Sequence, residues 1–320
     1  MANKENKINI LITGADGQLG NSIKYFQNKY NNFKFFFRSK NELNIAKFRV
    51  LDSFFRDNRI HFVINTAAFT NVDLAEKHKK KCFKVNSLGP KYLSKLSIKY
   101  DFILIHISTD YIFDGNKKKR YIENDRPRPL SIYGKSKLEG ENLIIKNSNK
   151  YIIIRVAWLY GAYKNNFFTK IVKKISDDKK HNIIDTQLAF PASSHSLSRD
   201  ILIIIENLTL SINKDPYSGI YNYGPTHKPI SRYFFAKSIV KILIDRDMIK
   251  KITKCENKFL LKKFSNVNSI SKNELNIRPN NSMLDNNKFF KKFKIKKRTF
   301  KDNLIESINI YINKKLYKNL

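Results

Sequence analysis

The first half of the chain alternates short apolar runs with segments long enough to form helices, and this alternation constrains the fold most. The apolar runs lack a polar face, as strands covered on both sides of a parallel sheet do. Because parallel strands need crossover connections, a repeated strand–helix pattern predicts an α/β fold with a doubly wound parallel sheet of Rossmann type. The predicted strands are 8–13, 33–37, 61–67, 102–108 and 151–158, and the predicted helices lie near 18–29, 47–58, 73–99 and 131–148.

A glycine-rich turn, GADGQLG, follows the first predicted strand and opens the first predicted helix. It places glycines at Gly14, Gly17 and Gly20. Glycine lets the backbone turn tightly and approach a pyrophosphate, which the helix N-terminus attracts through its free N–H groups and its dipole. The turn therefore predicts a dinucleotide cofactor. Its G-x-x-G-x-x-G spacing resembles that of the extended short-chain dehydrogenase/reductases, and a turn that serves only the fold is the alternative.

The end of the second predicted strand indicates which dinucleotide is bound. Arg38, Ser39 and Lys40 stand where an NAD-specific protein carries an acidic residue for the ribose 2′-hydroxyl. Basic side chains suit a 2′-phosphate, so the sequence favours NADPH over NADH. A solvated loop is the alternative interpretation of these residues.

The second half is less regular. Residues 1–160 are expected to form mainly a dinucleotide-binding Rossmann domain, and residues 161–320 mainly a smaller substrate-binding lobe at the carboxyl edge of the sheet. Segments at about 197–224 are expected to return to the Rossmann sheet. Ser231 is placed to cap a helix. The predicted elements are helices near 165–176, 197–212, 232–244 and 300–316, a strand at 219–224, and a loop at 183–196.

The chain is strongly basic, with 62 Lys and Arg against 27 Asp and Glu and a formal net charge of +35. Such a charge raises the hypothesis of nucleic-acid binding. The lysines, however, extend from Lys4 to Lys318 without gathering in one segment, which is typical of a compositional bias. We therefore expect no nucleic-acid partner, while a basic surface still favours an anionic substrate.

Several features predict a cytoplasmic protein. No stretch reaches the roughly 18 apolar residues of a membrane helix, and the polar N-terminus lacks the apolar segment of a secretory signal. The two cysteines, Cys82 and Cys255, lie far apart, without the spacing of a disulfide framework or a zinc site. We expect no membrane insertion.

Polar side chains end the fourth predicted strand, in the segment STDYIFDG. Burying Ser108, Thr109 and Asp110 is costly unless they have partners, so their position predicts a site. Tyr133 and Lys137 lie 24 and 28 residues after Thr109, on one face of the next predicted helix. The strand end and the helix start both face the predicted dinucleotide crevice.

These residue types fit a carbonyl reduction. A free phenol titrates near pH 10, and the Lys137 ammonium is expected to lower the pKa of Tyr133 toward the range of a general acid/base. Thr109 is expected to hydrogen-bond the substrate carbonyl, with Ser108 as the alternative for this role. Tyr133 then supplies the proton when the nicotinamide delivers hydride.

Five motifs together resemble the dTDP-4-dehydrorhamnose reductase family. They are STDYIFDG, YGKSKLEGE (133–141), RVAWLYG (155–161), NTAAFTNVDLAE (65–76) and RPNNSMLD (278–285), and the similarity covers about residues 8–290. The resemblance implies reduction of the 4-keto group of dTDP-4-dehydro-β-L-rhamnose with NADPH or NADH. It also implies a homodimer and a Mg²⁺ dependence found in some members, for which we name no ligands.

The resemblance also implies site residues. The catalytic residues are Thr109, Tyr133 and Lys137, and the substrate contacts are Thr109, Asp110, Tyr111 and Trp158, although a core aromatic is the alternative for Trp158. The cofactor-binding residues are Gly14, Asp16, Gly17, Gln18, Leu19, Gly20, Arg38, Asn65, Ala67, Ala68, Tyr133 and Lys137.

Some positions depart from the family pattern. Lys164 stands where glycine is common, and the segment TQLAFPA keeps the usual Gln187 and Pro191. Thr186, Ala189 and Ala192 replace the usual residues there, as Thr66 and Phe69 do near the cofactor. None of these changes the predicted catalytic residues.

Two other functions stay open. One is a reductase, epimerase or dehydratase of another nucleotide-linked sugar, because extended dehydrogenases share one fold. Dehydratases carry an acidic pair after the Ser/Thr, whereas Tyr111 follows Asp110 here, which favours reduction. The other is a non-catalytic dinucleotide-binding subunit, like the regulatory subunit of methionine adenosyltransferase.

Overall fold

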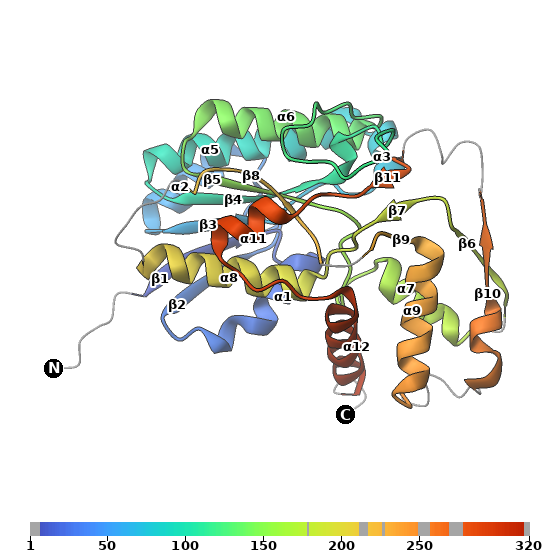
Figure 1. Ribbon diagram of the computed structural model, residues 1–320. Coiled ribbons are helices and arrows are strands. Elements are labelled where there is room, and N and C mark those ends of the chain that lie inside the picture. The colour runs from blue at the N-terminus through green and yellow to red at the C-terminus, as the bar shows by residue number, and fades with distance from the viewer. Residues whose placement is uncertain are drawn as a thin grey trace.

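A six-stranded, entirely parallel sheet forms the centre of the computed structural model, which describes residues 7–177, 179–210, 217–225, 228–248, 257–268 and 278–316 (Figure 1). The strand order is β2-β1-β3-β4-β5-β8. All five strands predicted for the first half are confirmed, as is the doubly wound α/β fold. The strands are β1 (Ile8–Thr13), β2 (Phe33–Arg38), β3 (Phe62–Asn65), β4 (Ile103–Thr109), β5 (Tyr151–Val156) and β8 (Gly219–Tyr223).

Helices cover both faces of this sheet, because successive strand residues point to opposite sides. In β1, Ile10 and Ile12 pack into the apolar cluster of one face and Leu11 into that of the other. The first face is covered by α1 (Gln18–Phe26), α8 (Ser194–Leu210) and α11 (Asn287–Phe293), and the second by α2 (Phe48–Asp57), α5 (Gly89–Lys99) and α6 (Ile132–Asn147). Each fully buried aliphatic side chain stabilises the fold by about 1.5–3 kcal/mol.

The predicted helix at 73–99 is interrupted. It consists of α3 (Val72–Lys77), α4 (Lys79–Phe83), a π-helical turn (Lys84–Leu88) and α5. Pro90 at the start of α5 has no N–H to donate to the preceding turn. Within the π turn, the Asn86 side chain accepts from Phe69 N at 2.8 Å and donates to Phe69 O at 3.0 Å. The interruption thus fixes the loop that follows β3.

The second half adds a group of elements beside the carboxyl ends of the central strands (Figure 1). Phe168, Phe235 and Leu304 belong to its own apolar cluster. Within the described residues its helices are α7 (Phe167–Ile175), α9 (Arg232–Asp245) and α12 (Phe300–Leu316), and its strands are β6 (His181–Ile184), β7 (Leu188–Ala189), β9 (Ile230–Ser231), β10 (Phe264–Val267) and β11 (Asn281–Ser282). Two elements that lie between β7 and β9 in the sequence belong to the central sheet instead, because α8 packs beside α1 and β8 pairs with β5.

The prediction of a loop at 183–196 is wrong in part. Strand β7 lies within it and pairs with β9 and β11, which are distant in the sequence. Helix α8 begins at Ser194, before the predicted residue 197, and residues 211–212 lie outside the described part. The predicted cap is confirmed, because the Ser231 side chain accepts from Phe234 N at 3.0 Å.

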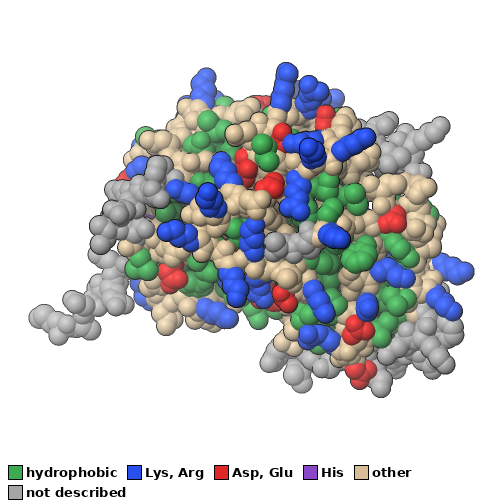
Figure 2. Space-filling view, in the orientation of Figure 1, with side chains coloured by type: hydrophobic (Ala, Val, Ile, Leu, Met, Phe, Trp, Pro, Cys, Tyr) green, Lys and Arg blue, Asp and Glu red, His purple; other side chains and the backbone are tan. Residues whose placement is uncertain are grey.

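The charged side chains are distributed over the surface, as the spread of lysines along the sequence predicts. Figure 2 shows lysine and arginine side chains spread over the visible face, with acidic and apolar side chains between them. Within the described ranges, no helix is both long and apolar enough to cross a membrane. Cys82 is buried with a free thiol, and Cys255 lies outside the described residues.

Candidate active site

A cleft of about 720 Å³ opens at the carboxyl ends of the central strands. It is lined by the glycine turn, the loop after β3, the end of β4 and the starts of α6, α7 and α9. Thirteen predicted site residues line it, from cofactor, catalytic and substrate groups alike. They are Gly14, Asp16, Gly17, Gln18, Leu19, Ala67, Ala68, Thr109, Asp110, Tyr111, Tyr133, Lys137 and Trp158.

The glycine turn is shaped for a close approach. Gly14 has φ +64°, which side chains rarely adopt, and a Cβ there would lie 2.7 Å from the backbone N and Cα of Ala67. Gly17 caps α1 without a side-chain hydrogen bond, which leaves N–H groups of the first helical turn for a ligand. These features fit the pyrophosphate of a dinucleotide.

Replacing Gly14 with alanine is expected to lower the free energy of unfolding by about 1–3 kcal/mol, because the left-handed backbone and the contact with Ala67 both oppose a methyl group. Affinity for NADPH is expected to fall as well. The matched control is Gly17→Ala, since Gly17 has φ −71° and its Cβ would meet only Gly14 O, at 3.0 Å. Denaturant unfolding measures the free energy of unfolding, and fluorescence titration measures the affinity for NADPH. Equal losses of stability in Gly14→Ala and Gly17→Ala would contradict this account.

Three predicted cofactor residues lie outside the lining. The guanidinium of Arg38 donates to Phe37 O and lies over the rings of Phe36 and Phe54. Of the two basic residues at the end of β2, Lys40 is therefore the one that lines the cleft. Asn65 is fully buried behind the cleft, and Gly20 faces the backbone of Ala15. Sequence reasoning identified the basic loop but not which side chain turns inward.

The start of α6 is held firmly against the end of β4. Ser131 caps the helix by accepting from Gly134 N at 3.1 Å, and Glu76 accepts from Ile132 N at 2.7 Å. Gly134 has no room for a Cβ, which would collide with Tyr111 O. The rings of Tyr111 and Tyr133 meet edge to face, with centroids 5.5 Å apart. Tyr133 is thereby placed beside the strand end that carries Thr109.

The Tyr133 phenol is held protonated. Burial raises the pKa of Tyr133 well above its ordinary value, and a hydrogen bond with Thr109 lowers it in part. The expected lowering by Lys137 is not what this structure shows, since the Lys137 ammonium donates instead to Ile107 O at 2.6 Å. Burial lowers the pKa of Lys137 to about 8, and the charge of Glu141 opposes this shift. A protonated phenol can act as an acid.

Ser108, the alternative to Thr109, also lines the cleft, but its hydroxyl proton is engaged by a buried carboxylate, which favours Thr109 for the carbonyl contact. The Ser108 hydroxyl donates to the Glu141 carboxylate. This carboxylate also accepts hydrogen bonds from Arg155, at 2.7 Å from Nη2 and 3.1 Å from Nε. Glu141 and Arg155 are 1% and 2% exposed. This buried ion pair joins α6 to β5, and sequence reasoning missed it because the partners have no distinctive spacing.

The far side of the cleft is cationic and aromatic. The guanidinium of Arg232, at the start of α9, lies 4.0 Å from the ring centroid of Trp158, and its Nε donates to Gln187 Oε1 at 3.3 Å. Trp158 and Lys164 both adopt left-handed φ values, +46° and +59°. The value at Lys164 explains why glycine suits that position. Burial raises the pKa of Asp110 to about 6, while the hydroxyls of Ser282 and Thr109 oppose the rise.

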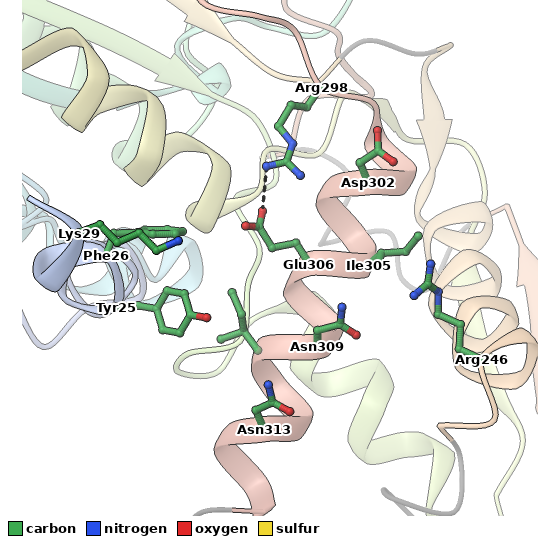
Figure 3. A pocket seen from close by; sticks show the side chains of 11 residues that line it. Tyr25, Phe26, Lys29, Arg246, Arg298, Asp302, Ile305, Glu306, Asn309 and Asn313 are labelled. Atoms are coloured by element: carbon green, nitrogen blue, oxygen red, sulfur yellow. Dashed lines mark ion pairs between the residues drawn. The ribbon is translucent and has the colours of Figure 1, made fainter. Parts of the chain in front are cut away.

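The Mg²⁺ dependence implied by the family resemblance finds no ligand set here. Among the described residues, no three His, Cys, Asp or Glu side chains gather where they could hold a metal ion. A second hollow of about 460 Å³ lies between α1 and α12 and contains none of the predicted site residues (Figure 3). Its Glu306 is paired with Arg298 and Arg199.

The fold and the cleft define a class of protein, a Rossmann-type reductase, whose cleft brings the glycine turn together with Thr109, Tyr133 and Lys137. The family model of the RmlD substrate binding domain matches residues 8–313, and the chain belongs to this family. The resemblance to dTDP-4-dehydrorhamnose reductases is thereby confirmed.

Similar proteins include two dTDP-4-dehydrorhamnose reductases and one protein of another name. The dTDP-4-dehydrorhamnose reductase of Aggregatibacter actinomycetemcomitans is 33% identical over 268 residues, which cover 80% of this chain and 88% of the relative. The crystal structure of dTDP-4-dehydrorhamnose reductase from Bacillus anthracis in complex with NADP has a TM-score of 0.80 at 26% identity, covering 94% of this chain and 98% of that one. Methionine adenosyltransferase 2 subunit beta of Danio rerio is 31% identical over 229 residues, 67% of this chain and 68% of the relative.

Proposed function

We propose that this protein reduces the 4-keto group of dTDP-4-dehydro-β-L-rhamnose to give dTDP-L-rhamnose. The observation that carries the proposal is the single cleft in which the glycine turn lies next to Thr109, Tyr133 and Lys137. When bound, the nicotinamide of NADPH or NADH supplies the hydride. Membership of the family and the named relatives support this substrate.

Each side chain then has a distinct task. The Thr109 hydroxyl binds the substrate carbonyl oxygen, where negative charge develops during reduction. Tyr133, held protonated by burial, donates its proton to that oxygen. Lys137 and the loop at Ala67 and Ala68 contact the cofactor. Asp110, Tyr111 and Trp158 surround the sugar.

Lys40, a basic side chain in the lining of the cleft, supports a 2′-phosphate and therefore NADPH. Residues 1–160 then serve the cofactor and residues 161–320 mainly the substrate, except for the returning segments α8 and β8. A cytoplasmic homodimer belongs to the same proposal.

Arg232 matches the negative charge of a nucleotide diphosphate. No ion pair to Arg232 is found among the described residues, so its charge is open to a ligand in the cleft. Because hydrogen bonds to charged groups contribute about 1.5–3 kcal/mol, Arg232→Met is expected to raise the KM for the nucleotide sugar about tenfold. The Kd for NADPH is expected to stay unchanged.

The control for that experiment is Arg246→Met, at the far end of the same helix and outside the cleft. Steady-state kinetics with varied sugar nucleotide measure both variants. An unchanged KM in Arg232→Met, with the control also unchanged, would exclude Arg232 from substrate binding.

The direct test follows NADPH oxidation with dTDP-4-dehydrorhamnose and with a panel of other nucleotide-linked keto-sugars. Preferred turnover of the dTDP-4-keto-6-deoxy sugar is the expected result. Preference for a different sugar would keep the reductase and change the substrate.

The similarity to methionine adenosyltransferase 2 subunit beta supports a second candidate, a dinucleotide-binding subunit without turnover. The complete Thr109, Tyr133 and Lys137 set weighs against it, because a binding subunit needs no proton donor. NADPH binding without oxidation on any sugar of the panel would establish this second candidate.

A further inference from the structure

A row of polar side chains crosses the sheet behind the cleft and ends at Lys137. Thr13, Asn65 and His106 are register partners on the adjacent strands β1, β3 and β4, so their side chains share one face. Thr13 Oγ1 lies 2.7 Å from Asn65 Oδ1, and Asn65 Nδ2 lies 2.9 Å from His106 Nδ1. His106 Nε2 then lies 3.0 Å from Lys137 Nζ.

All four side chains are buried, with exposed fractions of 0% for Thr13 and His106 and 1% for Asn65 and Lys137. Burial lowers the pKa of His106 well below its ordinary value, and the charge of Lys137 adds to this effect. His106 is therefore a neutral imidazole, in which one ring nitrogen carries a proton and the other a lone pair.

The charge on Lys137 decides which ring nitrogen of His106 carries the proton. An ammonium has three donors and no acceptor, so it requires the lone pair of His106 on Nε2 and the proton on Nδ1. Asn65 must then turn its amide over from the orientation in which Oδ1 faces Thr13 and Nδ2 faces His106, so that its oxygen accepts from Nδ1 and its NH₂ group faces Thr13. The exchange keeps the shape of the side chain, because the amide oxygen and nitrogen are nearly the same size. A neutral Lys137 amine permits the opposite arrangement at every step.

We propose that His106, oriented by Asn65, is a positioning residue that holds the Lys137 ammonium in the active site through its Nε2 lone pair. The inference rests on the proposed function only for the catalytic use of Lys137. The titratable groups facing Lys137 are His106 from β4, Tyr133 and Glu141 from α6, and Cys82 from α4. Among them His106 is the one that provides a neutral acceptor at hydrogen-bond distance.

The first test needs no activity. Nitrogen NMR of the full chain labelled in histidine, with His106 assigned by comparison with His106→Gln, distinguishes a protonated from an unprotonated ring nitrogen. A neutral ring with its proton on Nδ1 at pH 7 is expected. A proton on Nε2, or an imidazolium, would overturn the proposal.

The second test separates positioning from folding by two amide variants. In His106→Gln the amide oxygen can take the place of Nε2, whereas in His106→Asn the shorter side chain reaches only the place of Nδ1. His106→Asn is expected to lower kcat about tenfold without changing the KM for the sugar, and to move the alkaline limb of the pH profile to lower pH. His106→Gln is expected to restore both.

Asn65→Asp is expected to shift the alkaline limb of the pH profile in the opposite direction from His106→Asn. A carboxylate opposite Nδ1 favours the proton there and adds negative charge, so the alkaline limb is expected to move to higher pH. If the alkaline limb of the pH profile lies at the native pH in both His106→Asn and Asn65→Asp, the proposal is overturned. If the native chain turns over no sugar, the proposed function fails, and the NMR result still decides the tautomer.

Discussion

Tyr133→Phe is expected to lower kcat about 10³-fold while the Kd for NADPH stays within about twofold, because general acid catalysis contributes typically 10²–10⁴-fold. The variant removes one oxygen atom and keeps the ring that packs edge to face on Tyr111. Burial holds the phenol protonated, so the lost group is the proposed proton donor itself. Thr109, the proposed partner of the carbonyl oxygen, remains in place.

NADPH oxidation at saturating sugar nucleotide, with fluorescence titration of NADPH, measures the two quantities. Tyr25→Phe is the control, since Tyr25 lies outside the cleft and is 48% exposed. A Tyr133→Phe protein that keeps more than about a tenth of native turnover would transfer the role of acid to another group.

Glu141→Gln is expected to lower the free energy of unfolding by about 3–5 kcal/mol, the range for breaking a buried ion pair from one side. The substitution keeps the shape of the side chain but leaves the Arg155 guanidinium buried without its carboxylate. The Ser108 hydroxyl loses its ionised acceptor as well.

The double variant Glu141→Leu with Arg155→Met is expected to recover most of this loss, because replacing both partners by apolar side chains is often neutral. Asp52→Asn is a surface control that removes the exposed pair with Lys99 and is expected to cost far less. Denaturant unfolding measures all three variants. A loss in Glu141→Gln no larger than in Asp52→Asn would contradict the importance assigned to the pair.

Much of the architecture could be predicted because it depends on local pattern. Apolar runs such as 8–13 form strands wherever helices can cover both faces, and Ser231 caps α9 through a contact three residues away. The short strand β7 could not be predicted, since its two residues are held by β9 and β11. The break before α5 has a local signal in Pro90, although the π turn itself does not.

The candidate site divides in the same way. The glycine turn and the pair Tyr133 and Lys137 carry their chemistry in residue type and short spacing. Arg232, His106 and the pair Glu141 and Arg155 do not, because each acquires its partner only when distant segments meet.

The order of strand and helix, the glycine turn and the types of residue at the end of β4 follow from the amino-acid sequence, because they depend on neighbours along the chain. Tertiary structure decided that Ser108 turns to Glu141 and Arg38 to aromatic rings, that burial raises the pKa of Tyr133, and that Lys137 meets His106. The physical reason is that desolvation and hydrogen-bond partners depend on what lies across space, which the spacing of residues along a chain does not specify.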